Sequence, residues 1–152
     1  LGFSFYKHNG KIHIRIAKRT LERFMDKIRK LTKRTRSGKL ADILQELNRY
    51  VVGWVAHYRL AETPSVYQRQ DEWLRRRLRQ LLWKRWKRGT TRFRELVRLG
   101  IPKERARLSA SGRSPWHMSR TPVMNEALNS VFWRNSGLVN MTERYNQLRY
   151  SH

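Results

Sequence analysis

Residues 65 to 89 constrain the fold more than any other stretch, because a single helix accounts for both their apolar and their basic side chains. Five apolar residues share one side of that helix at about 100° per residue: Tyr67, Leu74, Leu78, Leu81 and Leu82. The other side carries basic residues around two tryptophans: Arg75, Arg76, Arg79, Lys87, Trp83 and Trp86. No acid occurs from Trp73 to Arg94, so we expect the apolar stripe to face a core and the basic side to face a polyanion.

Taken alone, such a helix is also compatible with an ordinary solvated basic face and with tryptophans that belong to the core. The whole chain favours a ligand, since 35 Lys and Arg residues stand against 11 Asp and Glu, a formal net charge of +24. This charge exceeds what solubility needs and repels itself unless an anionic partner neutralises it. Nucleic acid fits best, because the surplus lies on predicted helices that also carry aromatic residues, and no exposed apolar face indicates a membrane.

The bulk composition suits one folded domain, or a domain with a small appendage. With 39% hydrophobic residues the chain can bury a core, and the absence of cysteine excludes disulfides and thiolate zinc sites. No secretory signal or long apolar run is present. The first residue is Leu1, so we expect a fragment of a longer protein. The inferred partner indicates an intracellular location, in the bacterial cytosol or nucleoid, or in an organelle if the source is eukaryotic.

Residues 2 to 16 predict a β-hairpin, because Phe and Ile side chains alternate with polar ones around an Asn9-Gly10 turn. Three amphipathic helices with short connections are expected next: 18 to 33, Ser37-Gly38 to Arg59, and 66 to 88. Thr63 or Ser65 is expected to cap the third helix, and Gly89 to end it. Gly53, inside the second helix, favours a close approach by another helix or backbone.

Shorter helices are expected in the rest of the chain. Thr90 or Thr91 caps one that ends at Gly100, and Pro102 begins another that ends near Leu108. Residues 109 to 116 read as a linker, followed by one helix from Thr121-Pro122 to about Ser136 and a second capped by Asn140 or begun one turn earlier. The chain is therefore expected to be mainly α, with an N-terminal β-hairpin (1–17), a helical domain built on a three-helix bundle (18–108) and a small C-terminal helical segment (109–152).

A second group of candidate contact residues lies between the first two predicted helices. Seven cations occur there without an acid: Lys27, Arg29, Lys30, Lys33, Arg34, Arg36 and Lys39. Cations are favoured at a helix C-terminus, but seven exceed what the helix dipole accounts for. The candidate nucleic-acid-binding set consists of the cations of this run other than Arg29, together with Arg75, Arg76, Arg79, Trp83, Trp86, Lys87 and Arg88 of the third helix, and Arg113 and Arg120 near the C-terminal segment.

The sequence carries no pattern typical of catalysis. Asp26, Asp42 and Asp71 fall on three separate predicted helices, so no paired carboxylates of a two-metal nuclease or polymerase are expected. The five histidines lack metal-ligand spacing, and no nucleophile motif or Gly-rich phosphate loop occurs. We therefore expect no catalytic residue, metal or cofactor.

Four segments resemble the reverse transcriptase/maturase proteins encoded by group II introns. LGFSF with the following hairpin and KIHIRIAKRTLERF resembles the end of their palm, and LNRYVVGWVAHYR (47–59) resembles their thumb, here Leu47, Asn48, Gly53, Trp54 and Tyr58. DEWLRRRLRQLLWKRWKR (71–88) is similar to the family's basic Trp-bearing helix. Residues 112–148 are similar to the segment beyond the thumb, with Arg113, Trp116, His117 and Arg120 as its candidate contact surface.

The resemblance implies a maturase-specific domain, also called domain X or the thumb, with the segment that follows it. It implies a thumb-like bundle that binds intron RNA for splicing and the RNA/DNA template–primer duplex for reverse transcription and intron mobility. It also implies contact with the palm and finger domains of a parent RNA-directed DNA polymerase, and makes target DNA a further candidate partner. The family's Tyr-x-Asp-Asp motif is not in this sequence, so neither polymerase nor endonuclease activity is assigned to it.

The primary hypothesis is therefore binding of structured RNA, with Lys and Arg on phosphates and Trp83 or Trp86 stacked on an unpaired base or a sugar. It predicts that charge reversal of Arg76 and Arg79 abolishes binding without unfolding the bundle. Two other classes stay open. One is a sequence-specific DNA-binding module with a basic helix in a major groove. The other is an interaction domain whose basic face meets an acidic protein or the rest of its own polymerase.

Overall fold

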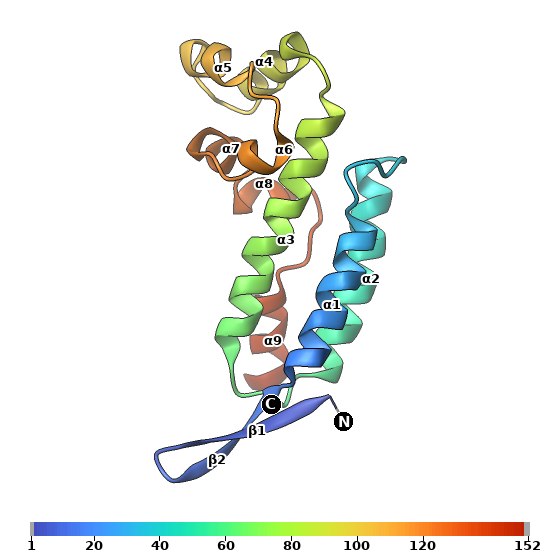
Figure 1. Ribbon diagram of the computed structural model, residues 1–152, viewed down its shortest axis with the longest axis vertical. Helices are drawn as coiled ribbons and strands as arrows, with labels where there is room; N and C mark the ends of the chain where they lie inside the picture. Colours follow the sequence, from blue (N-terminus) through green and yellow to red (C-terminus); the bar gives the residue numbers. More distant parts are fainter. Residues whose placement is uncertain (1, 151–152) are drawn as a thin grey trace.

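The computed structural model describes residues 2–150, and it begins with the predicted hairpin (Figure 1). Strands β1 (Phe3–His8) and β2 (Lys11–Ile16) pair antiparallel, with Phe3 opposite Ile16 and His8 opposite Lys11. Asn9 and Gly10 have φ angles of 52° and 74°, the left-handed values that a two-residue turn of this kind needs. The hairpin prediction is confirmed in its strands and in its turn.

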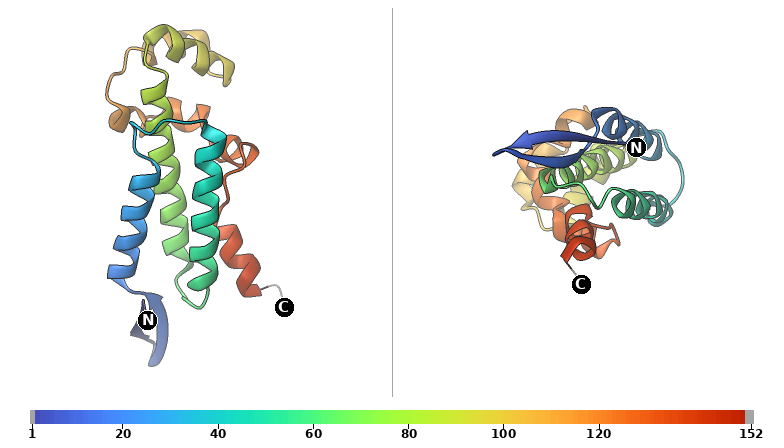
Figure 2. Two further views of the ribbon diagram at one scale, coloured as in Figure 1. Left: turned by 90° about the vertical axis from the view of Figure 1, so that its right-hand side faces the viewer. Right: turned by 90° about the horizontal axis from the view of Figure 1, so that it is seen from below.

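Three helices then run side by side in alternating directions, as Figures 1 and 2 show: α1 (Lys18–Leu31), α2 (Leu40–His57) and α3 (Pro64–Arg85). Helices α1 and α2 each bury one apolar stripe, whereas α3 is buried on more than one side. Phe24, Leu47 and Leu78 are among the fully buried side chains. The short connections between the helices force each helix to return along its predecessor. The predicted mainly α fold, with a hairpin before a helical bundle, is confirmed.

Several helix boundaries differ from the sequence prediction. Lys39, rather than Ser37, precedes the first turn of α2. At the end of α3, Lys87 takes the left-handed conformation expected of glycine, with a φ of 42°. The chain then extends at Arg88, whose carbonyl accepts the Arg92 N–H at 2.9 Å, so that Gly89 begins the next helix instead of ending α3. The predicted cap at Thr90 or Thr91 is therefore wrong, because both residues lie inside that helix. Thr63 takes the N-cap position before Pro64, as the sequence indicated, but its side chain makes no capping hydrogen bond.

The middle of the chain folds into short helices around the C-terminal half of α3 (Figure 1): α4 (Gly89–Arg98), α5 (Lys103–Ser109), α6 (Pro115–Met118), α7 (Pro122–Ala127) and α8 (Ser130–Asn135). The single helix expected after Pro122 is broken in two. The side chain of Asn129 accepts the Phe132 N–H at 2.9 Å and starts α8, and the carbonyl of buried Leu128 accepts Trp133 Nε1 at 3.1 Å. These two bonds satisfy backbone groups that a continuous helix would have used.

The C-terminal helix α9 (Met141–Tyr150) packs beside the N-terminal half of α3 and is tied to the bundle by polar contacts (Figure 1). The Asp71 carboxylate on α3 accepts the Met141 N–H at 2.8 Å and the Thr142 N–H at 3.0 Å. Asn140 caps the same helix by accepting the Glu143 N–H at 2.9 Å, as the sequence indicated. Sequence reasoning missed Asp71, because a residue that caps a distant helix leaves no local pattern.

Asn48, on α2, fixes the loop that leads into α9. Its amide nitrogen donates to the Gly137 carbonyl at 2.7 Å, and its amide oxygen accepts the Val139 N–H at 2.9 Å. Gly53, one turn further along α2, is exposed, and a Cβ added there would meet no atom within 4 Å. The close helix packing expected from Gly53 is therefore wrong for the residues that the structure describes.

The hairpin docks on the bundle through Gly2 and Glu62. The Gly2 carbonyl accepts the Ala17 N–H and the Thr20 hydroxyl, both at 2.9 Å. Glu62, between α2 and α3, accepts the Ile14 N–H at 2.6 Å, and this backbone bond lowers the pKa of the Glu62 carboxyl. Within residues 2–150, no helix combines the length and the apolar character that crossing a membrane requires.

Candidate nucleic-acid interface

Arg77 joins α3 to α1 and brings several positive charges together. Its Nε donates to the Thr32 hydroxyl at 3.1 Å, and its Nη2 donates to the Arg29 carbonyl at 3.3 Å. Burial, and then the charges of Arg29 and Arg34, lower the pKa of the Arg77 guanidinium. Because Arg29 and Arg34 each repel the Arg77 guanidinium, an anion beside Arg77 would be stabilised.

Arg85 extends the same cationic surface toward the end of α3. Its Nη2 donates to the Arg36 carbonyl at 2.8 Å, and Arg36 in turn donates to the Leu31 carbonyl at 2.7 Å and pairs with Glu46. The loop between α1 and α2 is thereby held against α3. Exposed Lys84 lies seven residues, or two helical turns, after Arg77 and so faces the same way.

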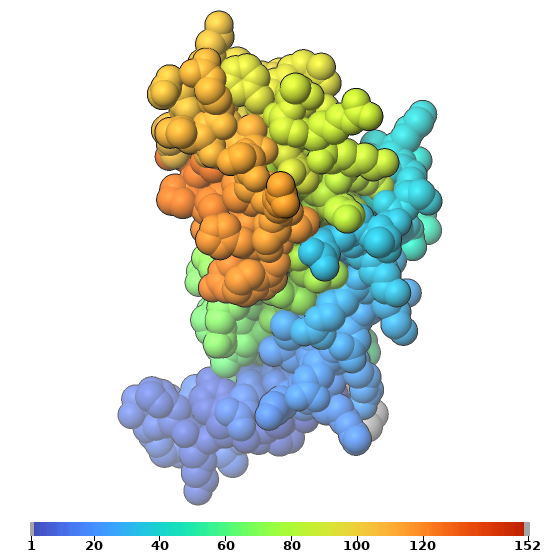
Figure 3. Space-filling view, turned by 45° about the horizontal axis from the view of Figure 1, so that its top comes forward, coloured from blue at the N-terminus to red at the C-terminus, as the bar shows by residue number. Residues whose placement is uncertain are grey.

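We call this surface the α1–α3 basic face, and it consists of Arg29, Arg34, Arg77, Lys84 and Arg85. Figure 3 shows its elements next to one another, with α1 and the following loop in blue to cyan beside the C-terminal half of α3 in green to yellow-green. Among the described residues, one carboxylate pairs with this set: Asp26 accepts from Arg29 Nη1 at 2.8 Å. The guanidinium of Arg29 also lies 5.4 Å from the centre of the Trp73 ring. Such an array suits an extended polyanion.

Only some of the cations predicted to bind nucleic acid between α1 and α2 lie at this face. Lys30, Lys33, Arg34 and Lys39 are exposed, whereas Arg36 is half-buried by its contacts with the loop. Lys27 is exposed on the other flank of α1, where its ammonium group lies 5.9 Å from the centre of the Tyr50 ring on α2. Of the run, the structure therefore brings Arg29 and Arg34 to the α1–α3 basic face directly, with Lys33 adjacent in the chain to Arg34.

Two residues predicted to contact nucleic acid lie in the protein interior. Trp83 is fully buried, and its Nε1 donates to the Gly112 carbonyl at 2.9 Å. Arg79 is 6% exposed and donates through Nε to the Ser119 carbonyl at 2.9 Å. Burial, and then the charges of Arg75 and Arg76, lower the pKa of Arg79 to about 10. Both side chains hold residues 112–119 on α3, so we leave them out of the interface.

Arg92 is a further anchor that sequence reasoning missed. Its Nη2 donates to the Trp83 carbonyl at 3.2 Å and its Nη1 donates to the Gly112 carbonyl at 3.1 Å. The guanidinium lies 4.7 Å from the centre of the Trp83 ring. In the sequence, Arg92 cannot be told apart from the other cations of a basic run. Its burial depends on the contact with Gly112, a residue twenty positions further along the chain.

The other predicted contact residues occupy separate surfaces. Arg75 lies on the opposite side of α3 from Arg77, Arg76 is half-buried, and Trp86 is half-buried with its ring centre 5.9 Å from that of Trp83. Lys87 and Arg88 are exposed after the end of α3. The predicted grouping of Arg75, Arg76, Arg79 and Lys87 on one side around Trp83 and Trp86 is wrong, because neighbouring helices bury parts of that side.

Arg113 and Arg120 lie near α6, and both are exposed. The Arg120 guanidinium is 4.8 Å from the centre of the Trp116 ring, which is itself 55% exposed. In the part of the chain that the structure describes, no three His, Asp or Glu side chains are grouped to hold a metal ion. The three aspartates lie apart, with Asp26 on α1, Asp42 on α2 and Asp71 on α3.

The fold and the basic face define the class of the protein: a helical module that holds arginine and lysine side chains in a fixed array. The sequence model of the family "Group II intron, maturase-specific domain" matches residues 21–100, more than half of the chain. The chain therefore belongs to the group II intron maturase-specific domain family. No curated protein matches it.

The matched segment begins within α1 and ends just after α4, so it contains the whole α1–α3 basic face. It also contains Asn48 and Asp71, the two side chains that tie the loop before α9 and the start of α9 to the bundle. The helices beyond residue 100 are thus attached to the family's domain through residues of that domain.

Proposed function

We propose that this group II intron maturase module binds intron RNA through the α1–α3 basic face and thereby assists splicing. The attachment of Arg77 and Arg85 to α1 and to the loop after it is the observation that carries this proposal, because it brings the Arg77 guanidinium close enough to Arg29 and Arg34 for each of them to repel it. Phosphates of a folded RNA supply anions at regular spacing along two strands. The bonds from Arg77 and Arg85 to backbone carbonyls hold the array in place before any ligand binds.

Binding through this face should depend steeply on salt, because each phosphate contact releases condensed counterions. With about five contacts, the logarithm of affinity is expected to fall against the logarithm of salt with a slope between about −3.5 and −4.5. Between about 50 and about 200 mM salt, that slope corresponds to a loss of roughly 100- to 500-fold. A weaker dependence would indicate that fewer cations take part.

Charge reversal at the exposed edge of the face tests the proposal. In the double variant Arg34→Glu with Lys84→Glu, both residues are exposed, so we expect the fold to be retained and the affinity for a group II intron RNA to fall by at least 100-fold. The matched control is Lys7→Glu with Lys11→Glu, an equal change in net charge placed on the hairpin. Equal losses in the two variants would show that net charge, and not the face, binds RNA.

The RNA/DNA template–primer duplex and the domains of a parent RNA-directed DNA polymerase are the further partners we propose. Support for a docked polymerase domain comes from the hairpin, where the Phe5 and Ile12 side chains are 66% and 68% exposed. Such exposed apolar side chains suit a second apolar surface. An intracellular site of action follows from these partners. No catalytic residue is assigned to this chain.

A sequence-specific DNA-binding module is less well supported. The α3 helix is flanked by α1, α6 and α9, so its cations have no continuous free side that could enter a major groove (Figure 1). Exposed Trp116, with Arg120 stacked on it, is the observation that favours contact with target DNA by the C-terminal segment instead. Competition between intron RNA and duplex DNA for the same protein would show which of the two ligands it binds more tightly.

A further inference from the structure

Arg79, on α3, carries a buried positive charge that lacks a counter-charge. Its side chain is 6% exposed, and the one hydrogen bond that it makes to the described residues runs from Nε to the Ser119 carbonyl at 2.9 Å. Within residues 2–150, no ion pair joins Arg79 to a carboxylate. Buried arginines are almost always paired, because a charge taken out of water costs free energy until an opposite charge and further hydrogen bonds replace the solvent. An anion beside Arg79 would supply both.

The two terminal nitrogens of Arg79 are available to such an anion. Neither Nη1 nor Nη2 makes a hydrogen bond to a described residue, and neither is sealed from solvent. The bond from Nε to the Ser119 carbonyl holds the guanidinium in place. A guanidinium held in this way presents its terminal nitrogens as a rigid fork, and that geometry binds two oxygens of one phosphate at the same time.

Two further arginines lie beside Arg79 on the same helix. Arg75 and Arg76 precede it by four and three residues, about one helical turn, and both are half-buried. Burial, and then the charges of Arg75 and Arg76, lower the pKa of Arg79 to about 10, so its guanidinium is still protonated at neutral pH. Arg76 has no hydrogen-bond or ion-pair partner among the described residues, and its Nε is buried, so only its terminal nitrogens reach solvent. These like charges favour an anion in their midst.

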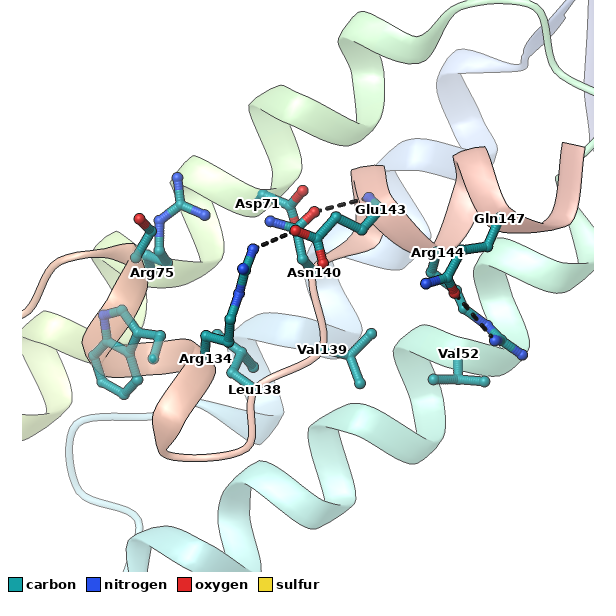
Figure 4. A pocket seen from close by; sticks show the side chains of 12 residues that line it. Val52, Asp71, Arg75, Arg134, Leu138, Val139, Asn140, Glu143, Arg144 and Gln147 are labelled. Carbon is teal, nitrogen blue, oxygen red and sulfur yellow. Dashed lines mark hydrogen bonds and ion pairs between the residues drawn. The ribbon is translucent and has the colours of Figure 1, made fainter. Parts of the chain in front are cut away.

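The nearby acids leave this charge largely in place. Asp71 lies one turn before Arg75 on α3 (Figure 4) and attracts it, but the Asp71 carboxylate is occupied by three hydrogen bonds from the start of α9. Exposed Glu72 lies one turn before Arg76 and makes no ion pair with it among the described residues. Residues 105–125, which include the segment packed on this side of α3, contain no acid.

We infer that Arg79 binds a phosphate group through its two terminal nitrogens, between α3 and the end of α6, with Arg75 and Arg76 adding to the positive charge of the site. The site is separate from the α1–α3 basic face, because Arg77 and Arg79 are two residues apart and project to nearly opposite sides of α3. Little of Arg79 is exposed, so the ligand is a free phosphate ion or the 5′-terminal phosphate of a strand. A bound phosphate would also strengthen the attachment of residues 112–119 to α3.

Titration of the full chain with inorganic phosphate at constant ionic strength tests the inference, with the Arg Nε–H resonances followed by NMR. The Arg79 resonance is expected to shift and to saturate at phosphate concentrations that leave the Arg77 resonance unchanged. Constant ionic strength removes the general effect of anions on a chain with a net charge of +24. An Arg79 resonance that does not shift, or that follows Arg77 without saturation, would overturn the inference.

The substitutions Arg76→Gln and Glu72→Gln should change the affinity for phosphate in opposite directions. Arg79 itself is kept, because its Nε also holds Ser119. Loss of the Arg76 charge is expected to weaken phosphate binding by about threefold to tenfold, and loss of the Glu72 charge to strengthen it by a similar factor. The matched control Lys7→Gln removes one exposed charge from the hairpin and should bind phosphate like the natural chain. Equal losses in Arg76→Gln and Lys7→Gln would show that net charge, and not this site, attracts phosphate.

Thermal unfolding gives a second readout of the same site. Phosphate at constant ionic strength should raise the melting temperature of the natural chain more than that of Arg76→Gln, because a ligand that binds the folded chain stabilises it in proportion to its affinity. The control Lys7→Gln should gain as much as the natural chain. If Arg76→Gln gains as much as the other two, Arg76 is not part of a phosphate site.

Short RNA oligonucleotides with and without a 5′-phosphate distinguish the two sources of the ligand. If the ligand is a strand end, the phosphorylated oligonucleotide shifts the Arg79 resonance at lower concentration than inorganic phosphate does, and the unphosphorylated one does not shift it. If the ligand is the free ion, inorganic phosphate shifts Arg79 and neither oligonucleotide does. The variant Arg34→Glu with Lys84→Glu should lose intron RNA and still bind phosphate at Arg79, so the phosphate site and the proposed function fail or stand separately.

Discussion

Single polar residues join parts of this chain that are far apart in the sequence. Asp71 is 5% exposed, and its carboxylate accepts three hydrogen bonds from the start of α9, seventy residues later. Asn48 acts in the same way on the loop that precedes α9. A buried polar group of this kind adds little to stability while it is satisfied, but its removal leaves the N–H groups of its partner unpaired.

We expect the stability contribution of Asp71 to depend on pH. Burial raises the pKa of Asp71 above its ordinary value of 3.8, against the opposing bonds from Met141 and Thr142. The folded chain therefore holds the carboxyl proton more tightly than the unfolded chain, so this stabilisation is complete below about pH 3.8 and is lost as pH rises through the raised pKa.

Urea unfolding of the natural chain and of Asp71→Asn, at several values from about pH 4 to about pH 7, measures this effect. The free energy of unfolding of the natural chain, minus that of Asp71→Asn, should increase as pH falls. Asp71→Ala should cost about 1–3 kcal/mol, and Asp71→Asn less, because the amide oxygen still accepts a bond. A difference that instead grows toward pH 7 would show that the α9 N–H groups hold the carboxylate charged.

Gly2 is a second position where one atom decides the packing. Its φ is +88°, and a Cβ added there would lie 2.8 Å from the Tyr58 hydroxyl oxygen and 3.1 Å from Thr20 Oγ1. Gly10 also has a positive φ, of +74°, but a Cβ there meets no atom within 4 Å. Substitutions at these two glycines therefore distinguish the cost of backbone strain from the cost of steric overlap.

We expect Gly10→Ala to cost about 1 kcal/mol of stability from the left-handed backbone alone. Gly2→Ala should cost about 1–3 kcal/mol more, because Tyr58 must also move. Thermal and urea unfolding give both values, and the amide resonances of Ala17 and Ile14 report on hairpin docking. Equal costs would mean that Tyr58 moves aside freely.

At the scale of elements, the sequence predicted the hairpin and the three long helices because each carries a local periodicity. Local periodicity did not predict which cations of α3 are buried and which helix each of them contacts. Arg77 and Arg79 are two similar arginines in one basic run, yet Arg77 faces α1 and Arg79 is buried against α6. The difference is made by residues 112–119, which return to α3 from a distant part of the chain and cover one of its sides.

Arg79 provides the test at this scale. We expect Arg79→Glu to destabilise the protein by about 3–5 kcal/mol, since a buried carboxylate would face the Ser119 carbonyl in place of a donor. Lys84→Glu, one turn and a residue further along α3 and exposed, should change stability by less than about 0.5 kcal/mol. Circular dichroism during urea unfolding compares the two. If Arg79→Glu unfolds like the natural chain and loses only RNA, Arg79 contacts RNA as its sequence context first indicated.

At the scale of the whole molecule, the sequence indicated a boundary at residues 109–116, because Ser, Gly and Pro cluster there. The structure adds contacts that cross this boundary, which no local pattern carries. Trp83 and Arg92 bind the Gly112 carbonyl, and Tyr145 stacks on buried Tyr67 with 4.5 Å between ring centres. The division into a helical domain (18–108) and a C-terminal segment (109–152) stays a prediction. Removing the contacts that cross residue 108 tests it.

We expect a chain that ends at residue 108 to lose cooperative folding, because α6 to α9 cover buried surface on α3. The shortened chain would uncover the sides of Tyr67 and Trp83 that Tyr145 and Gly112 contact, and would leave Asp71 without its three donors. Each large apolar side chain that returns to water costs about 1.5–3 kcal/mol, and several such losses approach the total stability of about 5–15 kcal/mol typical of a domain. Urea unfolding and hydrogen exchange would detect the loss. Added as a separate peptide, residues 109–152 should restore a single cooperative transition, whereas a shortened chain that already unfolds cooperatively with unchanged midpoint would show that residues 18–108 fold independently.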